Sequence, residues 1–201
     1  MKRTIEMILM TLLIVLVAAF VGSALISCSS DDDTIDDPMV DEKNVLLIQS
    51  DNGMTSRGTM YKSGEMYNPP HCYMGKSFVY NDDNPITVYY MGFGANIKGS
   101  DVFYMLNINF ESNKPMSFKD LKSGDTFDSS QFHASAAYTP TWPEFILRKA
   151  TALSGKVKVV GTSIVGDKSY LTLRLFNLRF NAIDNSCVYT VNGIVEYEIW
   201  E

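Results

Sequence analysis

The chain has 201 residues, and 23 acidic against 17 basic side chains give it a formal net charge of −6. Most of this charge lies near the N-terminus: residues 28–43 hold seven acids and one base, whereas residues 44–201 hold 15 acids and 14 bases. The nearly neutral body excludes the basic surface that nucleic-acid binding requires, and it lacks an acidic field that would attract a basic partner. Its length suits one domain with a sizeable core.

The N-terminus has the features of a secretory signal. Lys2 and Arg3 form a basic start, and residues 7–21 form an uncharged apolar run, the n-region and h-region of a signal peptide. A retained transmembrane helix is the alternative, because about 20 apolar residues suffice to span a bilayer. The small residues at 22–24 and the tetrapeptide that follows them favour cleavage.

That tetrapeptide, Leu25-Ile26-Ser27-Cys28, resembles the lipobox of bacterial lipoproteins. The resemblance implies that residues 1–27 are a signal peptide, that Cys28 carries a diacylglyceryl group on its sulfur, and that the membrane is a partner through this anchor. Two or three acyl chains hold a protein stably on a bilayer, whereas one chain binds only marginally.

The next residues extend the resemblance. Asp31, Asp32 and Asp33 follow the lipid-acceptor position closely. This run resembles the acidic export signal of surface lipoproteins in the Bacteroidota, which lies just after the acceptor cysteine. The resemblance implies an outer-membrane protein exposed at the cell surface. The alternative is a solvated acidic spacer. Asp33-Thr34-Ile35 resembles the short O-glycosylation sequon of that phylum, which implies modification of Thr34. Residues 28–43 are expected to form a disordered tether, because they cannot bury enough apolar surface.

The body, residues 44–201, is predicted to be all-β. No stretch longer than about ten residues keeps a helical period, and Gly92, Gly94 and Gly99 are predicted to mark a loop. Ser117 is predicted to cap one helical turn, whose Phe118 and Leu121 plug the end of a sheet. Before this turn, the apolar residues predict short strands at 45–48, 59–62, 78–80, 86–90 and 102–110.

The last fifty residues alternate most regularly. Leu153, Val157 and Val159 are expected to share one buried face, and Gly166-Asp167 marks a hairpin turn. Apolar residues then change phase between 171–175 and 176–180, which predicts a β-bulge. The inner face of the closing strand is predicted to consist of Tyr189, Val191, Val195, Tyr197 and Ile199.

Together these strands predict a single antiparallel β-sandwich or a small β-barrel, because no crossover helices separate them. The stretch from Gly155 to Gly193 also resembles the ending of many lipoproteins of the Bacteroidales. This resemblance supports the fold class and the source, and implies no activity.

Cys72 and Cys187 are a candidate disulfide in an exported protein; the alternative is two separate buried thiols. The two histidines, His71 and His133, match no zinc-binding spacing. The sequence has no nucleophile elbow and no glycine-rich phosphate loop. We therefore expect a non-catalytic protein without a metal or cofactor.

The candidate ligand-binding residues are Tyr138, Trp142 and Glu144. Two prolines keep this segment extended, and aromatic faces in a stiff loop suit stacking on a sugar or anchoring of a protein partner. The segment 67–73 likewise combines two prolines with aromatic residues. The alternative is that Trp142 covers the core.

Two functions follow from the sequence. One is a surface lipoprotein that captures a glycan or a protein partner without catalysis. The other is a lipocalin-like β-barrel that carries a small apolar ligand in its lumen.

Overall fold

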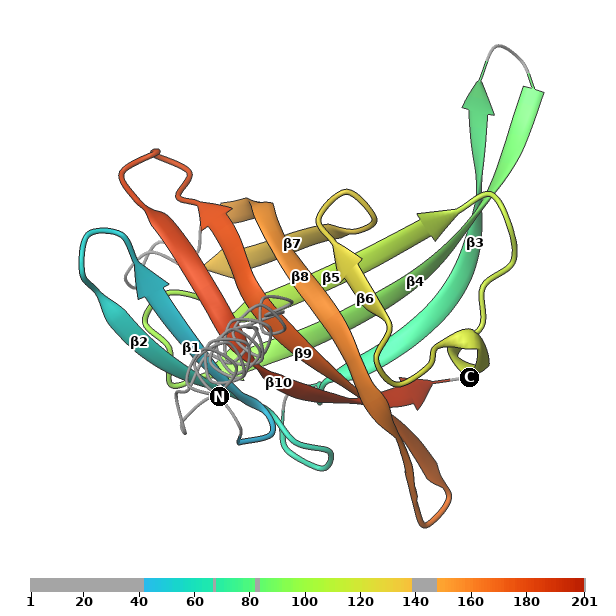
Figure 1. Ribbon diagram of the computed structural model, residues 1–201, viewed down its shortest axis with the longest axis horizontal. Helices are drawn as coiled ribbons and strands as arrows, with labels where there is room; N and C mark the ends of the chain where they lie inside the picture. Colours follow the sequence, from blue (N-terminus) through green and yellow to red (C-terminus); the bar gives the residue numbers. More distant parts are fainter. Residues whose placement is uncertain (1–41, 67, 82–83, 139–147, 201) are drawn as a thin grey trace, which may run out of the picture. The chain divides into compact units, whose positions relative to one another are not determined.

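The computed structural model describes residues 42–66, 68–81, 84–138 and 148–200. These ranges contain no α-helix, and none of their segments is a helix with the length and apolar character needed to cross a membrane. The all-β prediction is confirmed (Figure 1). The elements are β1 (Val45–Ser50), β2 (Thr55–Met60), β3 (His71–Asn81), β4 (Asn84–Lys98), β5 (Met105–Ser112), the 3-10 turn η1 (Phe118–Asp120), β6 (Thr126–Asp128), β7 (His133–Tyr138), β8 (Arg148–Val165), β9 (Lys168–Asn181) and β10 (Val188–Trp200).

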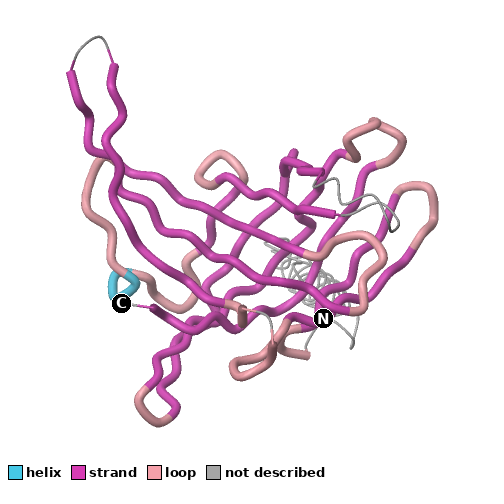
Figure 2. The backbone as a smooth tube through the Cα atoms, turned by 180° about the vertical axis from the view of Figure 1, so that it is seen from behind, coloured by secondary structure: helices cyan, strands magenta, loops and turns pink. Residues whose placement is uncertain are grey.

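The strands form one sheet that closes on itself. Starting from β4, the hydrogen-bonded neighbours are β5, β7, β8, β9, β10 and β3, and β3 pairs again with β4. β3 pairs only with the C-terminal end of β10, and β1 pairs with its N-terminal half. β2 lies between β1 and β4 and pairs with both. Figure 1 shows β8, β9 and β10 crossing in front of β4, β5 and β7, and Figure 2 shows the same sheet from behind.

One strand pair departs from the predicted antiparallel arrangement: β3 and β10 are parallel. Parallel neighbours need a long connection between them, and here most of the domain lies between the two strands. Every described strand pairing falls between residues 43 and 200, so a chain that starts at residue 29 contains the whole sheet.

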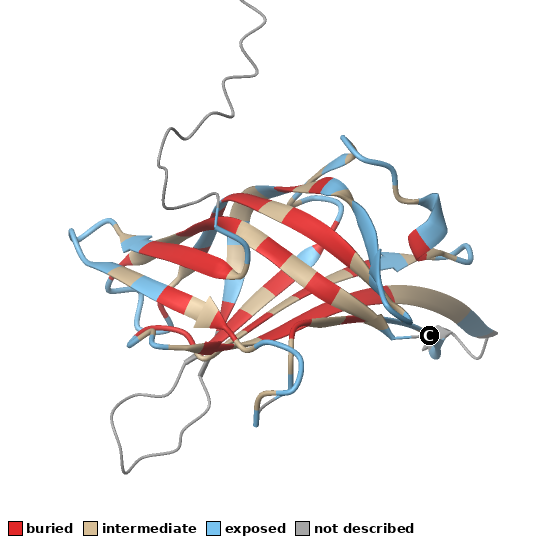
Figure 3. Ribbon diagram, turned by 90° about the horizontal axis from the view of Figure 1, so that it is seen from below, coloured by how far each residue is buried: buried red, intermediate tan, exposed pale blue. Residues whose placement is uncertain are grey.

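The core fills the inside of the closed sheet. Buried and partly exposed residues alternate along the strands (Figure 3). Val191, Val195 and Tyr197 of β10 are buried, as predicted for the closing strand. Phe93 of β4 is at the centre of an aromatic cluster with edge-on ring contacts, with centroids 5.7 Å from Phe110, 6.1 Å from Phe118 and 5.4 Å from Tyr197.

The predicted β-bulge is present in β9. Val191 of β10 faces Leu178 and Gly193 faces Leu175, so two residues of β9 lie opposite Asn192 alone. Asn177 in this bulge has a φ of 47°, and its backbone N–H donates to Asn192 Oδ1 at 2.7 Å. The extra residue changes the phase of the strand, which explains why Leu175 and Leu178 are both fully buried.

At the same level β8 changes register around Gly155, whose φ is +130°. The change leaves Val157 and Val159 buried but turns Leu153 outward, where it is 57% exposed. The prediction that Leu153 shares their buried face was therefore wrong, because the strict alternation of a strand is interrupted at a bulge.

The structure also corrects the limits of several strands: β2 ends at Met60 where the prediction extended to residue 62, and β3 covers His71–Asn81 where only 78–80 was predicted. Gly92 and Gly94 lie inside β4 and pair with both β3 and β5, so the predicted loop starts later. A Cβ on Gly92 would lie 2.5 Å from Tyr73 Cζ, so the aromatic ring of the neighbouring strand occupies the place of a side chain. The strand predicted over 102–110 begins only at Met105, although Phe103 before it is buried.

Candidate functional site

An apolar cavity lies inside the closed sheet, beside the segment 115–121. Its volume is about 190 Å³. Strands β4, β5, β6, β8 and β9 and the segment around η1 all contribute to its walls. The lining residues are Met91, Phe93, Phe110, Pro115, Met116, Ser117, Asp120, Leu121, Phe127, Val157, Val159 and Leu173.

The segment over the cavity has the predicted helical turn. Ser117 Oγ accepts a hydrogen bond from the Lys119 backbone N–H at 3.2 Å, which caps η1 as expected. Phe118 is buried, and Leu121 is partly buried against the core. Both side chains therefore pack against the core, as the prediction of an apolar turn expects, and Leu121 also lines the cavity.

The chemistry of the cavity is almost wholly apolar. Among the described residues that line it, only Ser117 and Asp120 have polar side chains. An engineered cavity of about 150 Å³ with an apolar lining stays dry and accepts a molecule the size of benzene. A cavity of this size and lining therefore suits one ring or a short stretch of hydrocarbon chain, and Met91 and Met116 can adapt their shape to it.

Several residues predicted as sites lie outside the described residues: Cys28, Thr34, Trp142 and Glu144. Tyr138 is the last residue of β7, where its backbone pairs with Arg148. The described residues that line the cavity include none that the sequence analysis proposed for ligand binding. No local signal in the sequence identifies its lining, which comes from strands that are distant along the chain.

The candidate disulfide is not formed, because Cys72 and Cys187 are separate buried free thiols. Cys72 pairs with Ile199 near the end of β10, whereas Cys187 directly precedes the first residue of that strand. At about 3.3 Å per residue, nearly the whole length of β10 separates them, far beyond the Cα distance of about 4.4–6.8 Å in a disulfide. Burial raises the pKa of the Cys72 thiol to about 12, as expected for a thiol within the core.

A second feature, the outer aromatic row, consists of His71, Tyr73, Tyr90 and Trp200 on the outer face of β3, β4 and β10. The His71 ring stacks on Trp200 with centroids 4.2 Å apart and planes 12° apart. Tyr73 meets Tyr90 edge-on at 6.1 Å. Trp200 is 44% and Tyr73 38% exposed, so ring surface is available to a ligand.

Hydrogen-bonding side chains adjoin the outer aromatic row. Asn107 and Asn109 of β5 face Gly94 and Gly92 of β4, and both asparagines are partly exposed. The sequence indicated that the segment 67–73 is rich in aromatic residues. It could not place Trp200 beside His71, because the contact between these two rings depends on the parallel pairing of β3 with β10.

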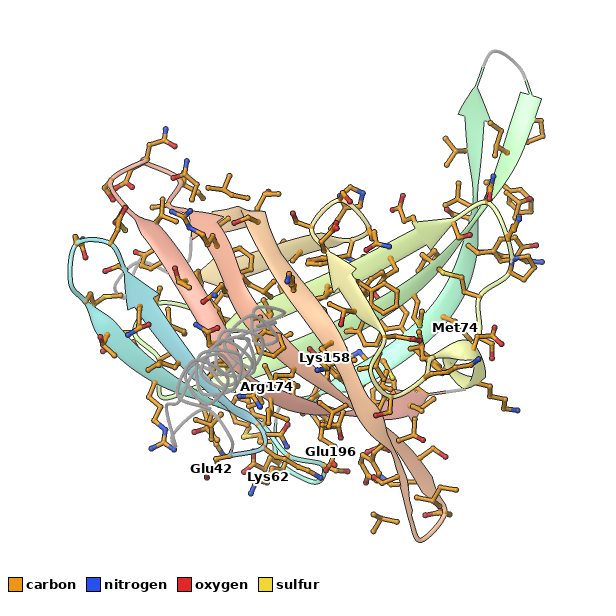
Figure 4. The ribbon with its side chains drawn as sticks, viewed as in Figure 1. Glu42, Lys62, Met74, Lys158, Arg174 and Glu196 are labelled. Atoms are coloured by element: carbon orange, nitrogen blue, oxygen red, sulfur yellow. The ribbon has the colours of Figure 1, made fainter. Side chains whose placement is uncertain are left out.

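Charged residues gather around a polar hollow lined by β10 and the segments near Lys43 and Lys62 (Figure 4). Its two carboxylates are paired: Lys43 Nζ lies 2.5 Å from Glu196 Oε2, and Lys168 Nζ lies 2.8 Å from Glu198 Oε1. The hydrogen bond to Glu198 also raises the pKa of Lys168. These acids therefore act as partners of lysines.

Over the described ranges, no cluster of three or more histidine, cysteine, aspartate or glutamate side chains could hold a metal ion. Comparison of the chain with protein-family models, with curated proteins and with solved structures finds no match. The cavity and the outer aromatic row are therefore the described features that bear on function.

Proposed function

We propose that this protein is a non-catalytic, lipid-anchored protein of the outer membrane that binds a small apolar ligand inside its closed sheet. The cavity beside 115–121 carries the proposal, because it combines a closed β-sheet with an apolar lining. The lipobox at 25–28 and the acidic residues 31–33 support anchoring through Cys28 and display at the cell surface. No cofactor takes part in this function.

The size of the cavity sets the expected affinity. Each buried methylene contributes about 0.8 kcal/mol, so a group of six or seven carbons gains roughly 5 kcal/mol from burial. That gain corresponds to a Kd between about 1 mM and 0.1 mM. Weak binding of a single ring, such as toluene, is the expected result.

Val159→Phe is expected to abolish toluene binding. Val159 is buried and lines the cavity, so a phenyl group there would occupy the space that toluene needs. Val160→Phe is the matched control, because this neighbouring residue of the same strand is exposed. Calorimetric titration of the unlipidated chain 29–201 with toluene measures the effect. Equal binding by Val159→Phe and the unmodified chain, or no binding by the unmodified chain, would contradict the proposal.

Capture of a glycan is a second candidate function, and the outer aromatic row favours it. The exposed ring of Trp200 and the amides of Asn107 and Asn109 supply the stacking surface and hydrogen bonds that a sugar ring uses. Trp142, which lies outside the described residues, remains a sequence-based prediction for the same function.

If the outer aromatic row binds glycans, Trp200→Ala should weaken binding by about 1–2 kcal/mol, since a stacking tryptophan carries much of the energy of a binding site. Phe78→Ala is a suitable control, because Phe78 is an exposed aromatic residue of β3 outside the row. A glycan array identifies the ligand, and titration compares the variants. Equal losses in the two variants, or an array without any bound glycan, would rule out this function.

A further inference from the structure

A second hollow also lies against Pro115 and Met116. It has a volume of about 250 Å³ and is lined by Met74, Gly75, Lys76, Tyr89, Tyr90, Pro115 and Met116. Pro115 and Met116 also line the apolar cavity. The two hollows are therefore neighbours that share one wall, and Met116 contributes an unbranched, flexible side chain to that wall.

A continuous strip of side chains on β3 and β4 joins the hollows. Met74 faces Met91 across the two strands, and Lys76 faces Tyr89. Met91 lines the cavity, whereas Met74 and Lys76 line the second hollow. Figure 4 shows Met74 beside the segment that carries η1. From the level of Phe93, which faces Cys72, to the level of Lys76 the strip is about 13 Å long.

The far end of the strip carries a positive charge. Lys76 is exposed, and the described residues include no carboxylate within ion-pair distance of its Nζ. The described residues that line the second hollow include no acid. An apolar cavity, a methionine strip and an exposed lysine thus follow one another along β3 and β4. This order is complementary to an amphiphile with an anionic head.

We propose that the two hollows form one binding site for an acyl anion, a free fatty acid of medium chain length. The hydrocarbon tail occupies the apolar cavity, the chain passes Met116, and the carboxylate lies at Lys76. Together the hollows offer about 440 Å³, the sum of 190 and 250 Å³, which falls in the range of about 300–1,000 Å³ typical of ligand sites. This inference rests on the proposed binding of an apolar ligand in the cavity.

The test compares decanoate with 1-decanol, which has the same chain without the charge, by calorimetric titration of the unlipidated chain 29–201. Lys76→Met is expected to weaken decanoate binding about fivefold, the upper range for an exposed ion pair, and to leave 1-decanol binding unchanged. Lys62→Met is the control, because Lys62 is an exposed lysine that lines the separate polar hollow. It should change neither affinity.

A second variant tests the connection between the hollows. Met116→Trp places a large ring at their shared wall and is expected to weaken 1-decanol binding at least tenfold, whereas toluene, which needs the cavity alone, should lose less. Unchanged decanoate binding in Lys76→Met, or unchanged 1-decanol binding in Met116→Trp, would overturn the acyl-anion site. After either result, toluene binding by the unmodified chain would still support the proposed function. Only a failure of the unmodified chain to bind toluene would contradict the proposed function and the acyl-anion site together.

Discussion

Gly155→Ala is expected to lower the free energy of unfolding by about 3 kcal/mol or more. Gly155 has a φ of +130°, and a Cβ there would lie 2.7 Å from the Leu178 Cα and 2.8 Å from the Asn177 backbone oxygen. Backbone atoms cannot rotate away as a side chain can. An unfavourable φ costs about 1–3 kcal/mol, and overpacking costs about as much again.

The loss should be large because the bulged backbone of β9 packs directly on Gly155. Gly161→Ala is the matched control on the same strand, since no heavy atom lies within 4 Å of a Cβ at that position. A glycine replaced without strain leaves stability unchanged or raises it by up to about 1 kcal/mol. Urea unfolding of the chain 29–201 measures both variants. If the two alanine variants unfold at the same midpoint, the bulge does not constrain β8 as described.

Cys28→Ala is expected to abolish lipid attachment completely. The thiol of Cys28 is the acceptor that the lipobox resemblance implies, and alanine has no nucleophile to replace it. The signal peptide should also remain uncleaved, because the lipobox resemblance implies cleavage directly before a lipid-bearing Cys28. Metabolic labelling with an alkynyl fatty acid, followed by gel analysis of mass and label, measures both effects.

Cys187→Ala is the control for this labelling. Cys187 is a buried free thiol of the folded body, so its removal should leave the label in place. Label of equal intensity on the Cys28→Ala variant would show that the protein is not anchored through this residue, and the apolar run at 7–21 would then have to be considered as a retained helix.

Local features of the fold could be predicted from the sequence because they depend on neighbouring residues. Alternation along one strand identified the inner face of β10, including Val195 and Tyr197. The change of phase after Leu175 located the bulge of β9. The cap at Ser117 predicted the turn η1, and the apolar pair Phe118 and Leu121 identified the side chains that pack against the core there.

The tertiary structure alone decided the features that depend on pairing between distant strands. The cavity takes its lining from residues between Met91 and Leu173, and no local pattern shows that these strands close into one sheet. Trp200 reaches His71 only because β10 lies parallel to β3, and the same long strand separates Cys72 from Cys187. A sequence records which face of a strand is apolar, but the identity of its neighbour across the sheet is fixed by packing of the whole core.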